Sequence, residues 1–123
     1  MSGGNIYLIL EFSDYDFYKI GVSQNIHKRR KKLQTGNPED LIVIKTFKSK
    51  NPFKLEKMLH MCYSKNRVNG EWFKLSMEEV KDFLQVCQKY EDTVDLLIEH
   101  NPFYAKKIKK HEIVEQKSFL SST

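Results

Sequence analysis

The stretch NIYLILEFSDYDFYKIGV, residues 5–22, decides the fold. Apolar residues alternate in its first half: Ile6 and Leu8 fall on one side, and Tyr7 and Ile9 fall on the other, as in a β-strand. The polar turn-forming residues SDYD follow, and FYKIGV predicts a second strand. Two strands joined by a four-residue loop pair antiparallel, so we expect a β-hairpin.

The rest of the chain predicts one more strand and several helices. We expect a helix from Ser23 or Asn25 to about Gln34, a strand at 41–47, a helix at 51–63, a short strand at 71–75, a helix at 76–90 and a short helix at 93–99. A further helix starts at Asn101-Pro102 and frays in the final SFLSST. The fold class is therefore α+β: a small antiparallel sheet, the hairpin plus a third strand, flanked by helices.

We divide the chain into a domain at residues 1–92 and a helical C-terminal extension at 93–123, which packs on that domain or trails from it. The helix starts carry clear signals. Asn51 precedes a proline and serves as a cap, and Ser76 with Glu79 forms a capping box. The second of these helices should bury Val80, Phe83, Leu84 and Cys87.

Composition limits the classes of function. The 123 residues carry a formal net charge of +5, which suits a polyanionic partner. No apolar run reaches the roughly 20 residues that span a bilayer, and no secretion signal opens the chain. We therefore expect no membrane partner and a soluble intracellular protein of the cytoplasm or nucleus. The four histidines and two cysteines have no zinc-site spacing, and the two cysteines read as unpaired thiols.

The basic run HKRRKK at 27–32 is the first candidate for function. Ile26 and Leu33 share the core-facing stripe of this helix, and Arg29 and Arg30 flank that stripe. The other cations lie farther round the helix: Lys28, Lys31 and Lys32. The run is either a solvated basic face or a phosphate-binding surface, in which an arginine reaches the groove beside the hairpin and grips phosphate with its planar fork.

The helix at 51–63 carries the second candidate. Glu56, His60 and Tyr63 follow i, i+4, i+7 spacing beside its buried stripe. Glu56 either makes a surface ion pair or holds a hard cation that keeps most of its waters, as Mg²⁺ does. His60 could hydrogen-bond that carboxylate or a phosphate.

The ordered set of these residues resembles the GIY-YIG nuclease superfamily. The set comprises NIYLI with Tyr7, YKIG ending at Gly21, Arg29 eight residues on, a helix bearing Glu56, and the closing GEWF. The Glu-x-x-x-His spacing of Glu56 and His60 before GEWF is similar to a branch common in phages and large DNA viruses, in which the domain is often described as DNA-binding. If the protein is viral, this resemblance implies that it acts in the host cell. The resemblance covers residues 4–75.

This resemblance implies a metal-dependent phosphodiesterase that cuts nucleic acid, usually DNA. Tyr7 matches the tyrosine that helps to activate the attacking water. Arg29 matches the arginine that steadies the developing charge on the phosphate, and Glu56 matches the carboxylate that holds the divalent ion, Mg²⁺ or Mn²⁺.

The sequence departs from the family pattern at the second motif. Lys19 stands where the family has its second tyrosine, and Tyr18 is one residue off, which in a strand points to the opposite face. Either a bulge brings Tyr18 to the site or Lys19 contacts the phosphate itself. The first motif begins with Asn5 instead of glycine, and Asn69 is the nearest counterpart of a late asparagine.

Two hypotheses of function follow. The first is a metal-dependent endonuclease, a hydrolase that nicks or cleaves DNA with Tyr7, Arg29 and Glu56, assisted by Lys19 and His60. The second is a nucleic-acid-binding module of the same fold without catalysis. In both, Lys28, Arg30, Lys31 and Lys32 bind the nucleic-acid backbone. RNA and branched DNA are further candidate partners, and a homodimer is one option for the oligomeric state.

Overall fold

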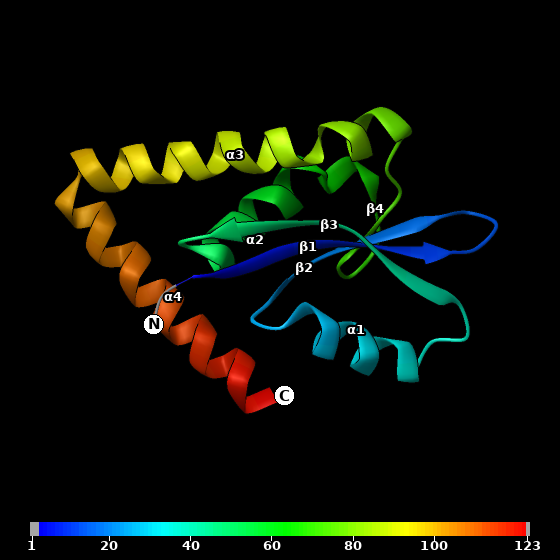
Figure 1. The fold of residues 1–123 in the computed structure, drawn as a ribbon. Helices are drawn as coiled ribbons and strands as arrows, with labels where there is room; N and C mark the ends of the chain where they lie inside the picture. The colour runs from blue at the N-terminus through cyan, green and yellow to red at the C-terminus, as the bar shows by residue number, and fades with distance from the viewer. Residues whose placement is uncertain (1–2, 123) are drawn as a thin grey trace.

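A computed structural model describes residues 3–122 and contains a five-stranded antiparallel sheet between helices (Figure 1). The strands are β1 (Gly4–Phe12), β2 (Phe17–Ser23), β3 (Asp40–Ser49), β4 (Arg67–Asn69) and β5 (Trp72–Phe73), in the spatial order β3-β1-β2-β5-β4. The helices are α1 (Ile26–Thr35), α2 (Pro52–Cys62), the 3₁₀ turn η1 (Ser64–Asn66), α3 (Met77–His100) and α4 (Pro102–Ser122). The predicted α+β class, hairpin and third strand are confirmed.

Both faces of the hairpin are buried, and this places two small cores on opposite sides of the sheet. Ile6, Leu8 and Ile20 face α2 and α3, while Tyr7 and Ile9 face α1. The side of α1 that carries Ile26 and Leu33 packs against the second core, as predicted. In Figure 1, α1 lies on one side of the sheet and α2 and α3 lie on the other.

The pairing of β1 with β2 runs without a break from Asn5 opposite Ser23 to Glu11 opposite Phe17. This register puts Lys19 on the same face as Tyr7, whereas Tyr18 is buried in the core against the α2 side. The bulge that would bring Tyr18 to the face of Tyr7 is therefore absent from this strand pair.

Helix α3 differs from the prediction. We expected a break after Tyr90, but one helix runs from Met77 to His100, because Glu91 and Val94 are both buried on its inner side. The boundary chosen between residues 92 and 93 falls inside this helix. Leu84, expected in the core, is exposed, and Val94 extends the buried stripe instead. Strand β4 is an addition to the predicted elements: it lies between the helix expected at 51–63 and the strand expected at 71–75.

Two glutamates hold the junction between β3 and α2. Glu91 accepts hydrogen bonds from Ser49 Oγ at 2.7 Å and from the Lys50 N–H at 2.9 Å. Glu112 of α4 accepts from the N–H groups of Phe53 at 3.1 Å and Lys54 at 2.7 Å. Phe53 and Lys54 lie in the first turn of α2, where backbone N–H groups have no acceptor within the helix. The Glu112 carboxylate, which comes from another helix, accepts hydrogen bonds from these two groups.

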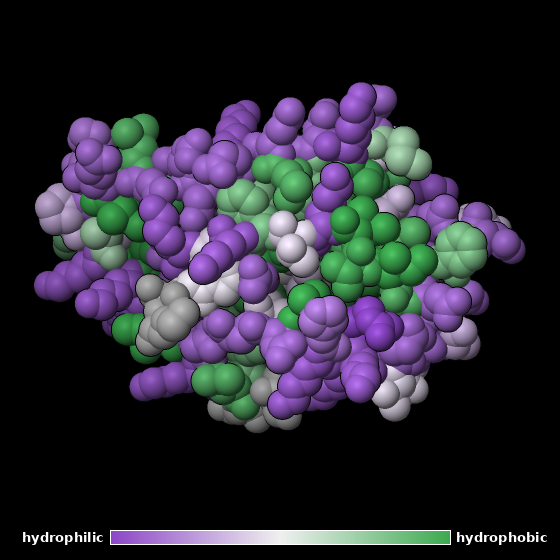
Figure 2. Space-filling model, in the orientation of Figure 1, coloured by the Kyte–Doolittle hydropathy of each residue, from purple (hydrophilic) through white to green (hydrophobic). Residues whose placement is uncertain are grey.

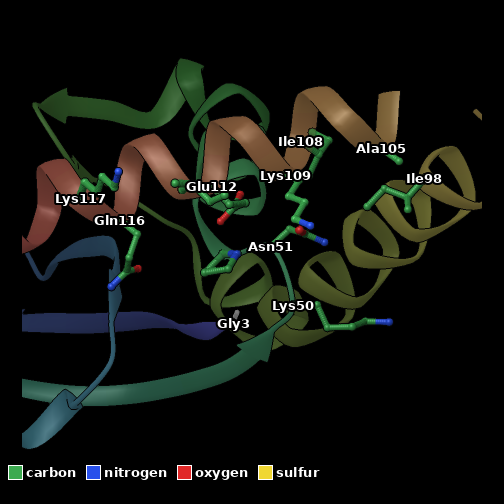
Figure 3. A pocket seen from close by; sticks show the side chains of 12 residues that line it. Gly3, Lys50, Asn51, Ile98, Ala105, Ile108, Lys109, Glu112, Gln116 and Lys117 are labelled. Atoms are coloured by element: carbon green, nitrogen blue, oxygen red, sulfur yellow. The ribbon is translucent and has the colours of Figure 1, made fainter. Parts of the chain in front are cut away.

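Asn51 occupies the N-cap position of α2, as predicted, but its side chain makes no capping hydrogen bond. Figure 3 shows Glu112 reaching from α4 toward Asn51 in its place. An apolar cavity of about 690 Å³ lies between α3, α4 and this junction. Within residues 3–122, no helix combines the length and apolar composition that a membrane span requires.

We predict that Glu91→Ala lowers the free energy of unfolding by about 2–4 kcal/mol, because it leaves the buried Ser49 hydroxyl and the partly buried Lys50 N–H without this acceptor. Urea denaturation measures this change. Glu99→Ala, at an exposed position of the same helix, is the matched control and should change stability little. Equal effects of the two substitutions would contradict the assigned role of Glu91.

Candidate functional site

A cavity of about 410 Å³ lies where β2, α1, α2 and α4 meet, and it brings together the three residues predicted to act on phosphate. Tyr7 comes from β1, Arg29 from α1 and Glu56 from α2. The other lining residues are Val22, Lys32, Phe53, Glu71, Glu115, Ser118 and Phe119. Residues far apart in the sequence therefore meet in one polar site.

Gly21 allows Tyr7 to enter this site. The two residues are direct partners across β1 and β2, and the Tyr7 ring lies against the backbone of Gly21. A Cβ atom at position 21 would collide with the hydroxyl and with Cζ of Tyr7. Any side chain there would force the tyrosine away, so glycine is required by this close approach.

The Tyr7 hydroxyl is fully buried and hydrogen-bonds with Arg29. Burial raises the pKa of Tyr7 to about 12, although the adjacent Arg29 cation opposes this shift. Tyr7 is therefore a neutral phenol at physiological pH. It can orient a water or a phosphate oxygen by hydrogen bonding.

Arg29 lies between Tyr7 and the C-terminal helix. Its guanidinium carbon is 5.9 Å from the centre of the Phe119 ring. Its Nε is buried and has no hydrogen-bond partner within residues 3–122. The arginine therefore has a donor available for an anion at the buried end of the cavity.

Glu56 is a half-buried carboxyl group with an altered affinity for protons. Burial raises its pKa from 4.5 to about 8, and the nearby Glu71 adds to the shift, while Lys19 partly opposes it. A buried carboxyl group stays protonated at neutral pH when too little positive charge lies near it. A bound cation supplies that charge and stabilises the ionised form. This favours Glu56 as a cation ligand over the alternative of a surface ion pair.

Lys19 lies beside the site and does not line the cavity. Its ammonium group pairs with Glu71 at 3.1 Å and lies 5.5 Å from the centre of the Trp72 ring. Sequence reasoning missed Glu71 as a site residue, although GEWF contains it. The charge of Lys19 suggested contact with a phosphate, but its ammonium group pairs with the Glu71 carboxylate instead.

His60 is turned away from the cavity. Its Nε2 lies 2.9 Å from the carbonyl oxygen of Ile20, and because a carbonyl only accepts, Nε2 donates. The same residue, Ile20, donates its N–H to the Glu71 carbonyl at 3.1 Å. His60 therefore binds the backbone of β2 at Ile20, the residue that follows Tyr18 and Lys19, which pair with β5. Asn69 is exposed in β4 and does not line the cavity either.

The basic run forms the outer surface of α1. Lys28, Lys31 and Lys32 are exposed and Arg30 is half-buried. Figure 2 shows hydrophilic side chains over the place of α1. Asn25 caps this helix by accepting from the Lys28 N–H at 3.2 Å, and this fixes the rotation that turns Arg29 inward.

Three lining residues from α4 were missed altogether: Glu115, Ser118 and Phe119. The sequence suggested that the chain frays at Ser118, but α4 continues to Ser122. Phe119 packs on Phe53 with 6.0 Å between ring centres, a contact with no local sequence signal. A single aromatic residue near the end of a polar helix was the only available hint.

A family model described as the T5orf172 domain matches residues 4–88. This domain is distinct from the GIY-YIG superfamily, so the family assignment made from the motifs is wrong. NIYLI and YKIG specify only a hairpin in which Tyr7 packs over Gly21, and this geometry is not particular to one family. The second tyrosine of the family pattern has no counterpart, because Tyr18, the nearest candidate, is buried in the core on the other face of the sheet. No curated protein and no solved structure matches the chain.

The raised pKa of Glu56 predicts a pH-dependent stability. The unfolded chain releases this proton near pH 4.5, whereas the folded chain holds it to about pH 8. The free energy of unfolding should therefore fall by a few kcal/mol as pH rises between these values, and then level off.

Urea denaturation at a series of pH values measures this fall. Glu56→Gln removes the titrating group and should flatten the dependence, whereas the exposed Glu78→Gln should leave it unchanged. An unchanged pH dependence in Glu56→Gln would show that Glu56 titrates normally.

Proposed function

The chain belongs to the T5orf172 domain family, and we propose that it is a metal-dependent endonuclease that hydrolyses phosphodiester bonds in DNA. The family is phage-associated, nuclease-like and linked to DNA binding, so the chain is a nucleic-acid-acting module. The observation that carries the finer proposal is that Tyr7, Arg29 and Glu56 line one cavity beside a basic helix.

The residues of the cavity fit a cation that is shared with the substrate. Within residues 3–122, no group of three His, Cys, Asp or Glu side chains is placed to hold a metal ion. Mg²⁺ commonly binds through one or two carboxylates together with substrate phosphates, and Glu56 with its neighbour Glu71 offers that number. A bound Mg²⁺ or Mn²⁺ would act as a Lewis acid toward the phosphate.

The protein groups divide the remaining work. Arg29 donates two parallel hydrogen bonds to the non-bridging phosphate oxygens and neutralises the charge that develops on them. Tyr7, as a neutral phenol, positions the attacking water against the phosphorus. Lys19 does not contact the phosphate in this proposal; it holds Glu71 at 3.1 Å and so fixes the charge beside Glu56.

The three lysines of α1 bind the DNA backbone next to the cavity. Lys28, Lys31 and Lys32 are exposed on the helix whose inner side carries Arg29, and Lys32 also lines the cavity. Point charges on phosphates give affinity without reading bases. The active site and the binding surface are thus two sides of one helix.

The second candidate function is a nucleic-acid-binding module without catalysis. One observation favours it: the Tyr7 side chain is fully buried and has no surface open to solvent. A nicking assay on supercoiled plasmid with Mg²⁺ or Mn²⁺, beside an EDTA control, separates the two. Metal-dependent nicking supports the endonuclease, and binding without any cleavage of DNA or RNA supports the module.

We predict that substitutions of three cavity residues impair the protein in different ways. Glu56→Ala should abolish nicking and leave DNA binding intact, because it removes the cation ligand and leaves Arg29 and the α1 lysines in place. Arg29→Ala should abolish nicking and weaken binding, and Arg29→Lys should not restore activity, since an ammonium group lacks the bidentate fork. Tyr7→Phe should lower the rate about 10²–10⁴-fold.

The controls for this series are His60→Gln and Tyr18→Phe, which change residues outside the cavity. Plasmid nicking gives the rates, and fluorescence anisotropy with EDTA gives the affinities. If Tyr18→Phe lowers the rate as much as Tyr7→Phe, the assignment of Tyr7 is wrong.

We also predict that the α1 lysines bind DNA by counterion release. Each of Lys28→Ala, Lys31→Ala and Lys32→Ala should reduce the slope of log affinity against log salt by about 0.9 on duplex DNA, similarly for every sequence. Lys81→Ala, exposed on α3 at the opposite face of the sheet, is the control. A change of sequence preference in any α1 variant would contradict a purely electrostatic role.

A further inference from the structure

The distal part of α4, residues 115–120, lies over the cavity that contains Tyr7, Arg29 and Glu56. Glu115, Ser118 and Phe119 all line that cavity. The Phe119 ring rests on two of its walls: it lies 5.9 Å from the guanidinium carbon of Arg29 and 6.0 Å from the ring centre of Phe53. The side chains of α4 thus occupy the space beside the arginine.

The covered arrangement keeps the reacting groups from solvent. Tyr7 has no exposed surface, and Arg29 Nε is buried without a hydrogen-bond partner among residues 3–122. An unsatisfied buried donor costs about 1–3 kcal/mol. A phosphate oxygen in contact with Arg29 would satisfy this donor, which the Phe119 ring cannot do. In the covered state Arg29 Nε therefore lacks an acceptor, and a bound anion would supply one.

The negative charge on the distal part of α4 also disfavours a nucleic-acid phosphate in the cavity. Glu115 brings a third carboxyl group to a cavity that already holds Glu56 and Glu71. Its charge adds to the raised pKa of Glu56. A phosphate that enters beside Arg29 meets the same repulsion, so removal of Glu115 from the cavity favours both a phosphate and an ionised Glu56.

The two parts of α4 are held unequally. The near part is anchored, because Ile108 is buried and Glu112 accepts two hydrogen bonds from the first turn of α2. In the distal part Glu115, Gln116 and Phe119 are half-buried and Leu120 is exposed. Gln116 is joined to Gln24 by a long hydrogen bond of 3.4 Å. Phe119 also packs on the larger core, so displacement of the distal part requires α4 to bend beyond Glu112 and this packing to be given up, while the hydrogen bonds of Glu112 can remain.

We propose that residues 115–120 of α4 form a cover that competes with the nucleic-acid phosphate for Arg29, so that the phosphate binds only when the cover moves away. The proposal rests on the proposed function for the identity of the anion. It predicts that the free protein is held in a low-activity state by its own C-terminal helix, and that nucleic acid itself opens the site.

Two substitutions test the cover in the full chain. Phe119→Ala removes the ring over Arg29, and Glu115→Gln removes the carboxylate that faces the phosphate. Binding of a short fluorescein-labelled DNA duplex, measured by anisotropy in EDTA, should tighten about 2- to 30-fold in Phe119→Ala, since an aromatic–cation contact of this kind is lost from the covered state only. Glu115→Gln should tighten binding in the same direction.

The matched controls are Phe103→Ala, which is 73% exposed at the start of α4, and Glu99→Gln, exposed at the end of α3. Both should bind as the wild type does. Unchanged or weaker binding in Phe119→Ala would overturn the proposal, because it would make Phe119 a bystander or a platform for a base. A thermal melt of each variant identifies any loss of folding.

Hydrogen exchange in the wild type gives a test that needs no substitution. Addition of the DNA duplex should speed exchange in residues 115–120 while it slows exchange in α1. Slower exchange in residues 115–120 would mean that the nucleic acid binds onto α4, and this would overturn the cover.

The same samples with Mg²⁺ separate this proposal from the proposed function. If Phe119→Ala binds more tightly but no variant cleaves DNA, the endonuclease fails and the cover stands. If the wild type cleaves DNA and Phe119→Ala binds and cleaves equally well, the cover fails and the endonuclease stands.

Discussion

The contact between Tyr7 and Gly21 is the constraint on which the candidate site depends. Because position 21 has no side chain, the Tyr7 ring packs across β2 and brings its hydroxyl to Arg29. The hairpin register makes these two residues direct partners, so the same pairing that builds the sheet also aims the tyrosine. Arg29 and Glu56 can then approach from helices on opposite sides of the sheet.

The hairpin and the helix starts could be predicted from the sequence itself, whereas the meeting of Tyr7, Arg29 and Glu56 was expected only from the resemblance to the GIY-YIG superfamily. Alternation fixed the faces of β1, and the spacing from Ile26 to Leu33 fixed which side of α1 turns inward. Those signals are local and periodic. The family could not be assigned correctly in this way, because a tyrosine packed over a glycine is a requirement of geometry and does not belong to one family alone.

The missing parts of the prediction depend on contacts between distant elements. Glu91 continues α3 through the expected break because it accepts hydrogen bonds from Ser49 and Lys50, which are 42 and 41 residues away in the sequence. Glu112 caps α2 from α4, and Phe119 reaches Phe53 and Arg29. No periodic pattern in the sequence indicates contacts of this kind. Sequence reasoning therefore treated the C-terminal helix as an extension of the domain and did not place it over the cavity.

The site combines a buried neutral phenol, a guanidinium with an unused donor and a carboxyl group whose pKa is near 8. The unused donor and the buried carboxyl group are costly in an ordinary core, and the phosphate and the cation that we propose would relieve both. The most direct measurement is a crystal structure with Mn²⁺ and a phosphorothioate DNA that resists hydrolysis. The account predicts an anomalous-scattering peak beside the Glu56 carboxylate and a phosphate on Arg29. A DNA backbone bound only to the lysines of α1, with no peak in the cavity, would contradict it.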